Sequence, residues 1–145
     1  METLGRLTRR QVDALRAIAP RETAQHGVSL KAIAASLKVR PPSALGHVTP
    51  LERLGLVERR RGKSRLTARG RATLLEYERH HRVAETLFSQ LGLSPEATCV
   101  AAREVDLSLS HKTVETVCAA EGHPPVCPHG EPIAACSTPK EGPRK

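Results

Sequence analysis

Apolar residues recur at helical spacing through the first third of the chain, and cap and turn residues separate the runs. The first predicted helix begins after Thr8, which forms an S/T-x-x-E/Q capping pattern with Gln11, and it ends at Pro20. A second, short helix begins after Ser29. A third begins at Pro41, where proline is acceptable because first-turn amides have no helical partner. The pattern therefore predicts three helices joined by short turns.

The pattern changes after the third helix. We expect Pro50 to kink or shorten that helix, because proline lacks an amide hydrogen and clashes one turn back. Apolar pairs on both sides of a basic turn with Gly62 predict a two-stranded hairpin over residues 56–66. Thr67 then caps a long helix that ends at Gly92. Three helices followed by a hairpin is the element order of a winged helix-turn-helix domain.

Two further helices are predicted beyond the long one, with Ser94 and Ser110 placed to cap them. We expect a mainly α chain in which a winged helix-turn-helix domain over residues 1–76 precedes an all-helical dimerisation domain over residues 77–136. A flexible tail is expected at residues 137–145.

The charge balance indicates a class of partner. The 145 residues carry a formal net charge of +8 and a pI of about 9.9, which favours a polyanion or an acidic membrane surface. No apolar run reaches the length of a membrane span, and the amino terminus lacks the apolar core of a secretory signal. We therefore expect a cytoplasmic protein with reduced thiols and no membrane partner. Tyr77 and Phe88 are the only aromatic residues, which favours duplex DNA over stacked single strands.

The third helix and the hairpin carry the candidate DNA contacts. The major groove admits one helix, whose amino-terminal side chains lie nearest the base edges. The candidates there are Arg40, Pro41, Ser43, Ala44 and His47. The hairpin adds five cations suited to phosphate contacts, which are Arg59, Arg60, Arg61, Lys63 and Arg65. The alternative is a winged helix used for protein contact, with a merely solvated charged hairpin.

His81 and Glu85 lie four residues apart on the long predicted helix, so they share one face and can bind a single ion together. Imidazole and carboxylate donors suit Mn, Fe, Co or Zn. A simple His–Glu hydrogen bond, or a solvated face beside His80, explains the same spacing. Spacing alone therefore leaves both interpretations open.

Several segments together resemble one family of regulators. Those shared with many winged-helix regulators are residues 29–34, 39–43, 51–57 and 66–70, and the more specific ones are residues 81–88, 91–93 and 127–133. Over roughly residues 8–135 the chain resembles the diphtheria-toxin-repressor and manganese-transport-regulator family of metal-dependent repressors. With no carboxy-terminal SH3-like domain, the short manganese-regulator form is the closer comparison. The resemblance implies a homodimeric repressor with a divalent transition metal that binds a palindromic operator in double-stranded DNA.

The resemblance also implies a ligand set. It makes His81 and Glu85 the core ligands and adds Asp13 from the first helix. Asp106 falls on a carboxylate-ligand position, and Cys99 falls where one branch of the family has histidine. The departures from the family pattern are Arg16, Arg103 and Leu107. Either the site is remodelled, with a thiolate that favours Fe, Co or Zn over Mn, or metal control is gone.

Other thiol and imidazole groups offer an alternative metal site. Its candidates are His123, Cys127 and His129, donors that Zn or Fe–S chemistry prefers, and Cys127 also suits haem. Cys118 is interpreted as a buried small residue and Cys136 as a tail thiol. The alternative function is a winged-helix regulator that has lost metal control or responds to redox, Zn or haem.

Dimerisation is expected because one short helix reads too few base pairs to find a site, and two-fold operators match two-fold proteins. The predicted apolar interface consists of Leu87, Leu91, Val114 and Val117. No nucleophile–base set and no phosphate loop occur in the sequence, so we do not expect an enzyme.

Overall fold

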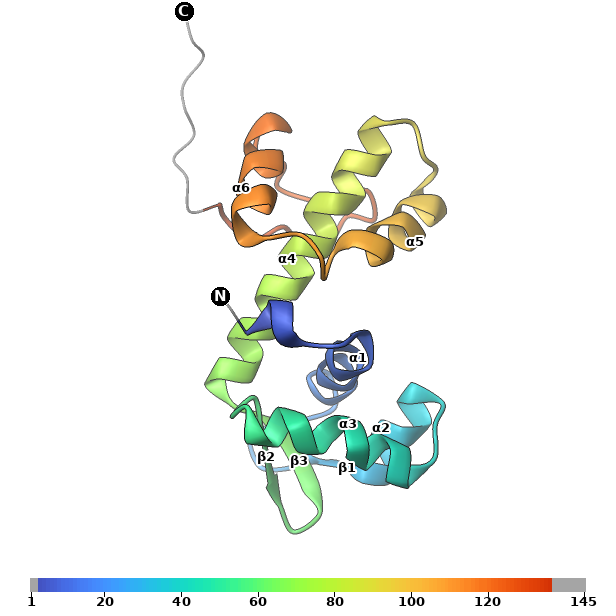
Figure 1. Cartoon of the computed structure of the whole chain (residues 1–145), viewed down its shortest axis with the longest axis vertical. Helices are drawn as coiled ribbons and strands as arrows, with labels where there is room; N and C mark the ends of the chain where they lie inside the picture. Colours follow the sequence, from blue (N-terminus) through green and yellow to red (C-terminus); the bar gives the residue numbers. More distant parts are fainter. Residues whose placement is uncertain (1–2, 137–145) are drawn as a thin grey trace, which may run out of the picture. The chain divides into compact units, whose positions relative to one another are not determined.

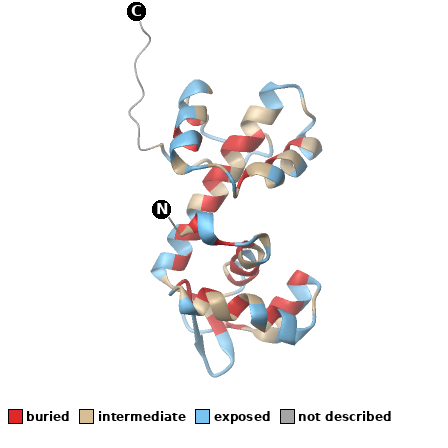
Figure 2. Cartoon of the chain, in the orientation of Figure 1, coloured by how far each residue is buried: buried red, intermediate tan, exposed pale blue. Residues whose placement is uncertain are grey.

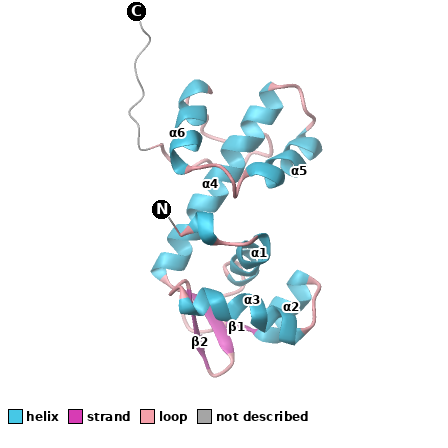
Figure 3. Ribbon diagram, viewed as in Figure 1, coloured by secondary structure: helices cyan, strands magenta, loops and turns pink. Residues whose placement is uncertain are grey.

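The computed structural model describes residues 3–136, and the predicted tail at residues 137–145 lies outside this range (Figure 1). The described chain is mainly helical with one small sheet, which confirms the predicted fold class (Figure 3). It divides into two compact units. The amino-terminal unit is Arg6–Leu74, and the carboxy-terminal unit contains the residues from Leu75 onward together with those before Arg6.

The amino-terminal unit has the predicted order of three helices and a hairpin. A 3-10 turn, η1 (Leu4–Arg6), precedes them, and the elements are α1 (Arg9–Ile18), β1 (Val28–Ser29), α2 (Leu30–Leu37), α3 (Pro41–Arg53), β2 (Val57–Arg60), β3 (Lys63–Leu66) and the first turns of α4 (Ala68–Gln90). The helices α1, α2 and α3 pack against one another around a shared apolar core (Figure 2). Its largest fully buried side chains include Leu15, Ile18, Ile33, Leu51 and Leu56.

The helix starts in this unit follow the sequence signals. The Thr8 side chain accepts from the Gln11 amide, and the Gln11 side chain accepts from the Thr8 amide, so the predicted capping box is present. Ser29 caps α2 by accepting from the Ala32 amide at 3.2 Å. α2 ends at Lys38, whose φ of 55° places it in the left-handed region and lets the chain turn directly into α3.

α3 continues through Pro50 to Arg53, so the predicted shortening of this helix is wrong. Proline removes the hydrogen bond that the Gly46 carbonyl would receive. Gly46 is solvent exposed, so water can satisfy that carbonyl, and glycine has no side chain to crowd the proline ring. Pro50 also lies in the last turn of the helix, where little helix remains to be disrupted.

The wing is the β2–β3 hairpin, which extends from the body of its unit (Figure 1). Its two-residue turn is Arg61 at φ 51° and Gly62 at φ 75°, and Arg60 pairs with Lys63 beside it. Two successive positive φ angles are typical of a type I′ turn, whose twist matches that of the strands. β1 adds a third strand to give the order β1-β3-β2. β1 was not predicted, because two residues are too few to show an alternating pattern.

The start of α4 rests closely on the chain that leaves α3. Thr67 caps α4 by accepting from the Gly70 amide at 3.0 Å, and its hydroxyl donates to the Gly55 carbonyl at 2.6 Å. The Leu56 carbonyl accepts from the Thr67 amide at 3.0 Å. A Cβ added at Gly70 would lie 2.0 Å from the Leu56 carbonyl oxygen. Only glycine therefore fits position 70 with this backbone.

The carboxy-terminal unit contains most of α4 with α5 (Pro95–Val105) and α6 (His111–Ala120). Ser94 and Ser110 cap the two shorter helices as predicted. Val83, Val114 and Cys118 form a buried cluster between α4 and α6. Within residues 3–136, no helix is both long enough and apolar enough to span a bilayer.

Burial changes the predicted dimer surface. Val114 is fully buried in the core of its own unit, so its assignment to a shared surface is wrong. Val114 lies on the face of α6 that packs against α4, so this apolar face is covered within the unit and is not available to a partner. Leu91 is 67% exposed and Val100 is 63% exposed, and both remain accessible.

Candidate metal centre and DNA interface

His81 is held by a buried carboxylate. Its Nδ1 hydrogen-bonds the Asp106 carboxylate at 2.9 Å, and Asp106, the residue after α5, is completely buried. An ionised carboxylate only accepts, so the proton of a neutral His81 lies on Nδ1. The Nε2 lone pair is then available to a metal ion.

Nε2 of His81 faces the second part of the cluster. Glu85 Oε1 lies 3.3 Å from it, one helical turn along α4, and Cys99 Sγ of α5 lies 3.7 Å from it. The imidazole, carboxylate and thiol donors all lie within 4.8 Å of one another. Glu85 is buried, while His81 and Cys99 are partly exposed. The site therefore has a water-accessible side and a donor set suited to a transition metal.

Glu85 belongs to a second donor cluster as well. His129 Nδ1 lies 3.2 Å from Glu85 Oε1, and Cys127 completes a group whose donors lie within 4.8 Å. Cys127 lies in a turn that is closed by its own amide donating to the Glu131 carbonyl at 2.9 Å. The structure thus brings Cys127 and His129 of the alternative set to the same carboxylate as His81.

His123, the third residue of that alternative set, belongs elsewhere. Its Nδ1 lies 3.7 Å from Cys118 Sγ, and Cys136 joins them in a separate cluster. Cys136 donates to the Glu115 carboxylate. Burial raises the pKa of Cys118, and the neighbouring Cys136 raises it further. The two thiols were interpreted singly, because 17 intervening residues conceal the fact that the chain returns to α6.

A further group was also missed. Glu76 and His80 on α4 and His111 on α6 have donors within 4.8 Å of one another. His80 is buried rather than on a solvated face. The pKa of His80 is lowered to about 4, mainly by burial and then by the neighbouring His111 and Arg79, while a hydrogen bond with the Asp106 backbone and the Asp106 charge partly oppose them. The Glu-x-x-x-His spacing at 76 and 80 is the signal that was available in the sequence.

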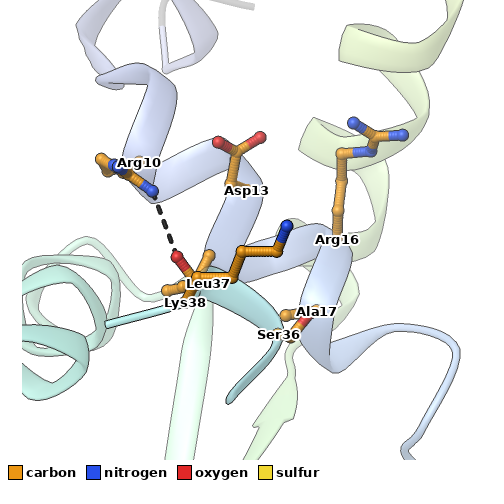
Figure 4. Close-up of a pocket in the computed structure, with 7 residues that line it drawn as sticks. All are labelled: Arg10, Asp13, Arg16, Ala17, Ser36, Leu37 and Lys38. Carbon is orange, nitrogen blue, oxygen red and sulfur yellow. Dashed lines mark hydrogen bonds between the residues drawn. The ribbon is translucent and has the colours of Figure 1, made fainter. Parts of the chain in front are cut away.

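Asp13 lies in a cationic environment within the amino-terminal unit. It lines a pocket between α1 and the end of α2 with Arg10, Arg16 and Lys38 (Figure 4). The Arg10 guanidinium donates to the Leu37 carbonyl at 3.3 Å. Three cations that line the same pocket as this carboxylate make the pocket less favourable for a metal ion. The assignment of Asp13 as a metal ligand stays a prediction.

The start of α3 offers the side chains expected to read bases. Arg40, Pro41 and Ser43 are exposed, and His47 is partly exposed one turn later. Ala44 is completely buried, so its assignment as a base contact is wrong. Ala44 lies on the face of α3 that packs against the core, and its methyl group is therefore covered by the protein itself.

The wing cations differ in their surroundings. Arg59 Nε lies 3.2 Å from Glu52 on α3 and braces the wing against that helix. Arg60 lies 4.0 Å from Glu58, and Arg65 is partly buried. The exposed cations at the turn and beside it are Arg60, Arg61 and Lys63, and the tip of the hairpin is exposed in Figure 2. The charge best placed for an external anion is therefore at the tip of the wing.

Comparison with known proteins supports this picture. Residues 67–135 match the family model described as the iron-dependent repressor, metal-binding and dimerisation domain. No curated protein sequence matches the chain. A hypothetical protein from Sulfolobus solfataricus shares 27% identity at a TM-score of 0.82, over 89% of this chain and 100% of that one.

Two named regulators are similar as well. IdeR from T. acidophilum shares 26% identity at a TM-score of 0.66, over 88% of this chain and 59% of that one. A manganese-dependent transcriptional repressor in complex with manganese shares 30% identity at a TM-score of 0.72, over 92% of this chain and 62% of that one. The chain thus spans about three fifths of the length of these two regulators.

A winged helix-turn-helix followed by a helical unit with clustered metal donors defines a class of metal-responsive transcription regulators. The matches show that residues 67–135 are similar to the metal-binding and dimerisation domain of iron-dependent repressors, and that most of the chain is similar to metal-dependent regulators of the diphtheria-toxin-repressor and manganese-transport-regulator type.

Proposed function

We propose that the chain is a homodimeric repressor that binds a palindromic operator in duplex DNA when a divalent transition metal is bound. The observation that carries the proposal is the convergence of His81, Glu85 and Cys99 beside a buried carboxylate that fixes the histidine tautomer. The similarity to metal-dependent regulators supports a regulator rather than an enzyme.

His81, Glu85 and Cys99 are the residues that would hold the ion. A bound divalent metal would supply a cross-link between α4, which carries the first two residues, and α5, which carries Cys99. The thiolate favours Fe, Co or Zn over Mn, because sulfur is a softer donor than oxygen or nitrogen. We propose that Asp106 orients His81 through Nδ1 and is not itself a ligand, because it lies on the opposite side of the ring from Glu85 and Cys99.

Cys127 and His129 form an adjoining part of this centre. Because they share Glu85 with the first cluster, one carboxylate serves both groups of donors. We propose that they stabilise the charge of Glu85 or complete the ligand shell when a larger coordination number is needed. His123 is assigned to a separate group of donors, since its neighbours are Cys118 and Cys136.

The proposed DNA contacts divide into two kinds. Exposed Arg40 and Ser43 at the start of α3 supply base contacts, and His47 extends them one turn along the helix. The wing, with Arg61 at its turn, supplies phosphate contacts. A dimer presents two such surfaces to the two halves of a palindrome. Leu91 and Val100, both exposed on the carboxy-terminal unit, are the proposed apolar contacts of that dimer.

The test compares metal content and DNA affinity in one experiment. Wild type, His81→Ala and a control, Lys112→Ala on the exposed face of α6, are titrated with Mn²⁺, Fe²⁺, Co²⁺ and Zn²⁺. Binding to a duplex selected in vitro from random sequences is measured with and without a chelator. We expect His81→Ala to lose metal and operator affinity together, while the control keeps both. Equal metal content in wild type and His81→Ala would remove His81 from the site. An operator affinity that is the same with and without the chelator would refute metal-dependent repression.

A further inference from the structure

We propose a second divalent-metal site in the carboxy-terminal unit, formed by Glu76 and His80 of α4 and His111 of α6. The site goes beyond the centre at His81 and shares no donor with it. Its donor set of two imidazole nitrogens and one carboxylate oxygen, without sulfur, is suited to Zn²⁺, Co²⁺ or Fe²⁺.

The first observation is a group of buried polar atoms without partners. Within the described residues, no hydrogen bond of ordinary geometry satisfies Glu76 Oε1, His111 Nδ1 or either ring nitrogen of His80, and the His80 ring has only a weak interaction with the Asp106 backbone. His80 is only 2% exposed. Buried polar atoms are almost always satisfied, and several unsatisfied atoms in one place indicate an ion or water that completes the network. An ion bound by these three residues would satisfy all but one of the four atoms.

The second observation is the spacing of the donors. Glu76 Oε1 lies 3.8 Å from His80 Nε2 and 3.9 Å from His111 Nδ1. Ligands about 2.0–2.1 Å from a tetrahedral ion are separated by about 3.4 Å. Small side-chain rotations therefore bring Glu76, His80 and His111 to ligand distance. Three protein ligands leave a fourth position for water, and the partial exposure of His111 gives solvent a path to it.

The third observation is a carboxylate behind one of the ligands. His111 would bind through Nδ1, and its Nε2 lies 3.5 Å from Glu115 Oε1, one turn along α6. A second carboxylate on the far nitrogen of a ligating histidine orients the ring and strengthens the ligand. Glu115 is itself held by Arg79 at 2.8 Å, so its negative charge is largely balanced and its position fixed.

The two proposed sites use different faces of α4. His80 and His81 are adjacent, so their side chains diverge by about 100° around the helix. His81 turns to Asp106 and α5, whereas His80 turns to His111 of α6. A metal at the second site would join α4 to α6, which the first site does not touch. It would therefore hold together the core of Val83, Val114 and Cys118, which the same two helices enclose.

A cobalt titration of the full chain distinguishes the two sites. Cobalt bound by Cys99 gives a thiolate-to-metal charge-transfer band, whereas a site of histidine and carboxylate gives only d–d absorption. We expect Cys99→Ser to lose the part of the charge-transfer band that arises from Cys99, leaving any contribution from Cys127, Cys118 or Cys136, and to keep d–d absorption from the second site. His111→Asn and Glu76→Gln should each bind one ion fewer than wild type and retain the charge-transfer band. His26→Asn, a histidine change on an exposed loop, serves as the matched control and should bind as wild type does.

Folding is checked by circular dichroism before each titration. Glu76→Gln is nearly isosteric, and His111 lies at the first position of α6, so at least one variant is expected to fold. Equal cobalt stoichiometry and affinity in wild type, His111→Asn and Glu76→Gln would overturn the second site. Loss of the charge-transfer band in His111→Asn would also overturn it, because the two sites would then not be separate. If Cys99→Ser lacks all cobalt absorption, no second site exists.

Discussion

Replacing Gly70 by alanine should destabilise the amino-terminal unit. The new methyl carbon would lie 2.0 Å from the Leu56 carbonyl oxygen, more than 1 Å inside an ordinary contact of about 3.2 Å or longer. That oxygen already accepts from Thr67, and Thr67 caps α4 through Gly70, so a shift disturbs both hydrogen bonds. Overpacking against backbone costs up to about 3 kcal/mol, the two weakened hydrogen bonds about 1 kcal/mol together, and the helix preference of alanine returns about 1 kcal/mol. The net loss is about 3 kcal/mol.

Urea denaturation followed by circular dichroism measures this change. Gly46→Ala is the matched control, because Gly46 lies inside α3 and no described atom lies within 4 Å of its added Cβ. The control should gain stability by up to about 1 kcal/mol through helix propensity alone. If the free energy of unfolding of Gly70→Ala lies within about 0.5 kcal/mol of the wild-type value, the close packing of α4 on the α3–β2 connection does not restrict position 70 to glycine.

Three further predictions concern charge and orientation. Arg61→Ala should reduce the slope of log binding constant against log salt by about 0.9, the effect of one phosphate contact, without changing base preference, whereas Lys112→Ala on α6 should leave the slope unchanged. Burial raises the pKa of Glu121 to about 7, so the folded state binds more protons than the unfolded state between pH about 4.5 and 7 and loses stability as the pH rises. In thermal melts, the free energy of unfolding of Glu121→Gln should therefore equal that of wild type near pH 4 and exceed it by about 2 kcal/mol at pH 8, a figure reduced for the partial exposure of the side chain. A stability difference that does not depend on pH would contradict this cause. Asp106→Asn should weaken metal binding about 10- to 100-fold while metal stoichiometry is retained at saturation, because it removes the carboxylate that orients His81; an unchanged affinity by calorimetry would refute the orienting role.

The helical elements were predictable because their signals are local. Thr8, Ser29, Ser94 and Ser110 each satisfy an amide within three residues, so the sequence itself contains both partners of the cap. Pro50 shows the limit of such rules. The expected damage depends on what surrounds the turn before the proline, and the exposed Gly46 is tolerant in a way that the proline rule does not contain.

The candidate site was predictable only in part, for a different reason. The pair His81 and Glu85 follows from helix periodicity, but the side of the His81 ring on which Asp106 lies depends on how α5 packs. Ala44 was assigned to DNA and Val114 to a dimer interface, because the sequence pattern does not show whether the protein's own core covers a residue. Glu76, His80 and His111 come together through the packing of α6 on α4, which residue spacing alone does not show.

The turn of the wing places a charged side chain at a residue whose backbone conformation is unfavourable for it. Arg61 has a φ of 51°, a conformation that glycine and asparagine adopt readily and that costs other residues about 1–2 kcal/mol. Asparagine at this position would make a more stable hairpin and a less cationic one. At this one residue the hairpin is therefore less stable than it would be with asparagine, and its turn carries a guanidinium group. A selection for stability alone would favour replacing Arg61 and would thereby remove its charge. Such a selection should therefore also measure DNA affinity.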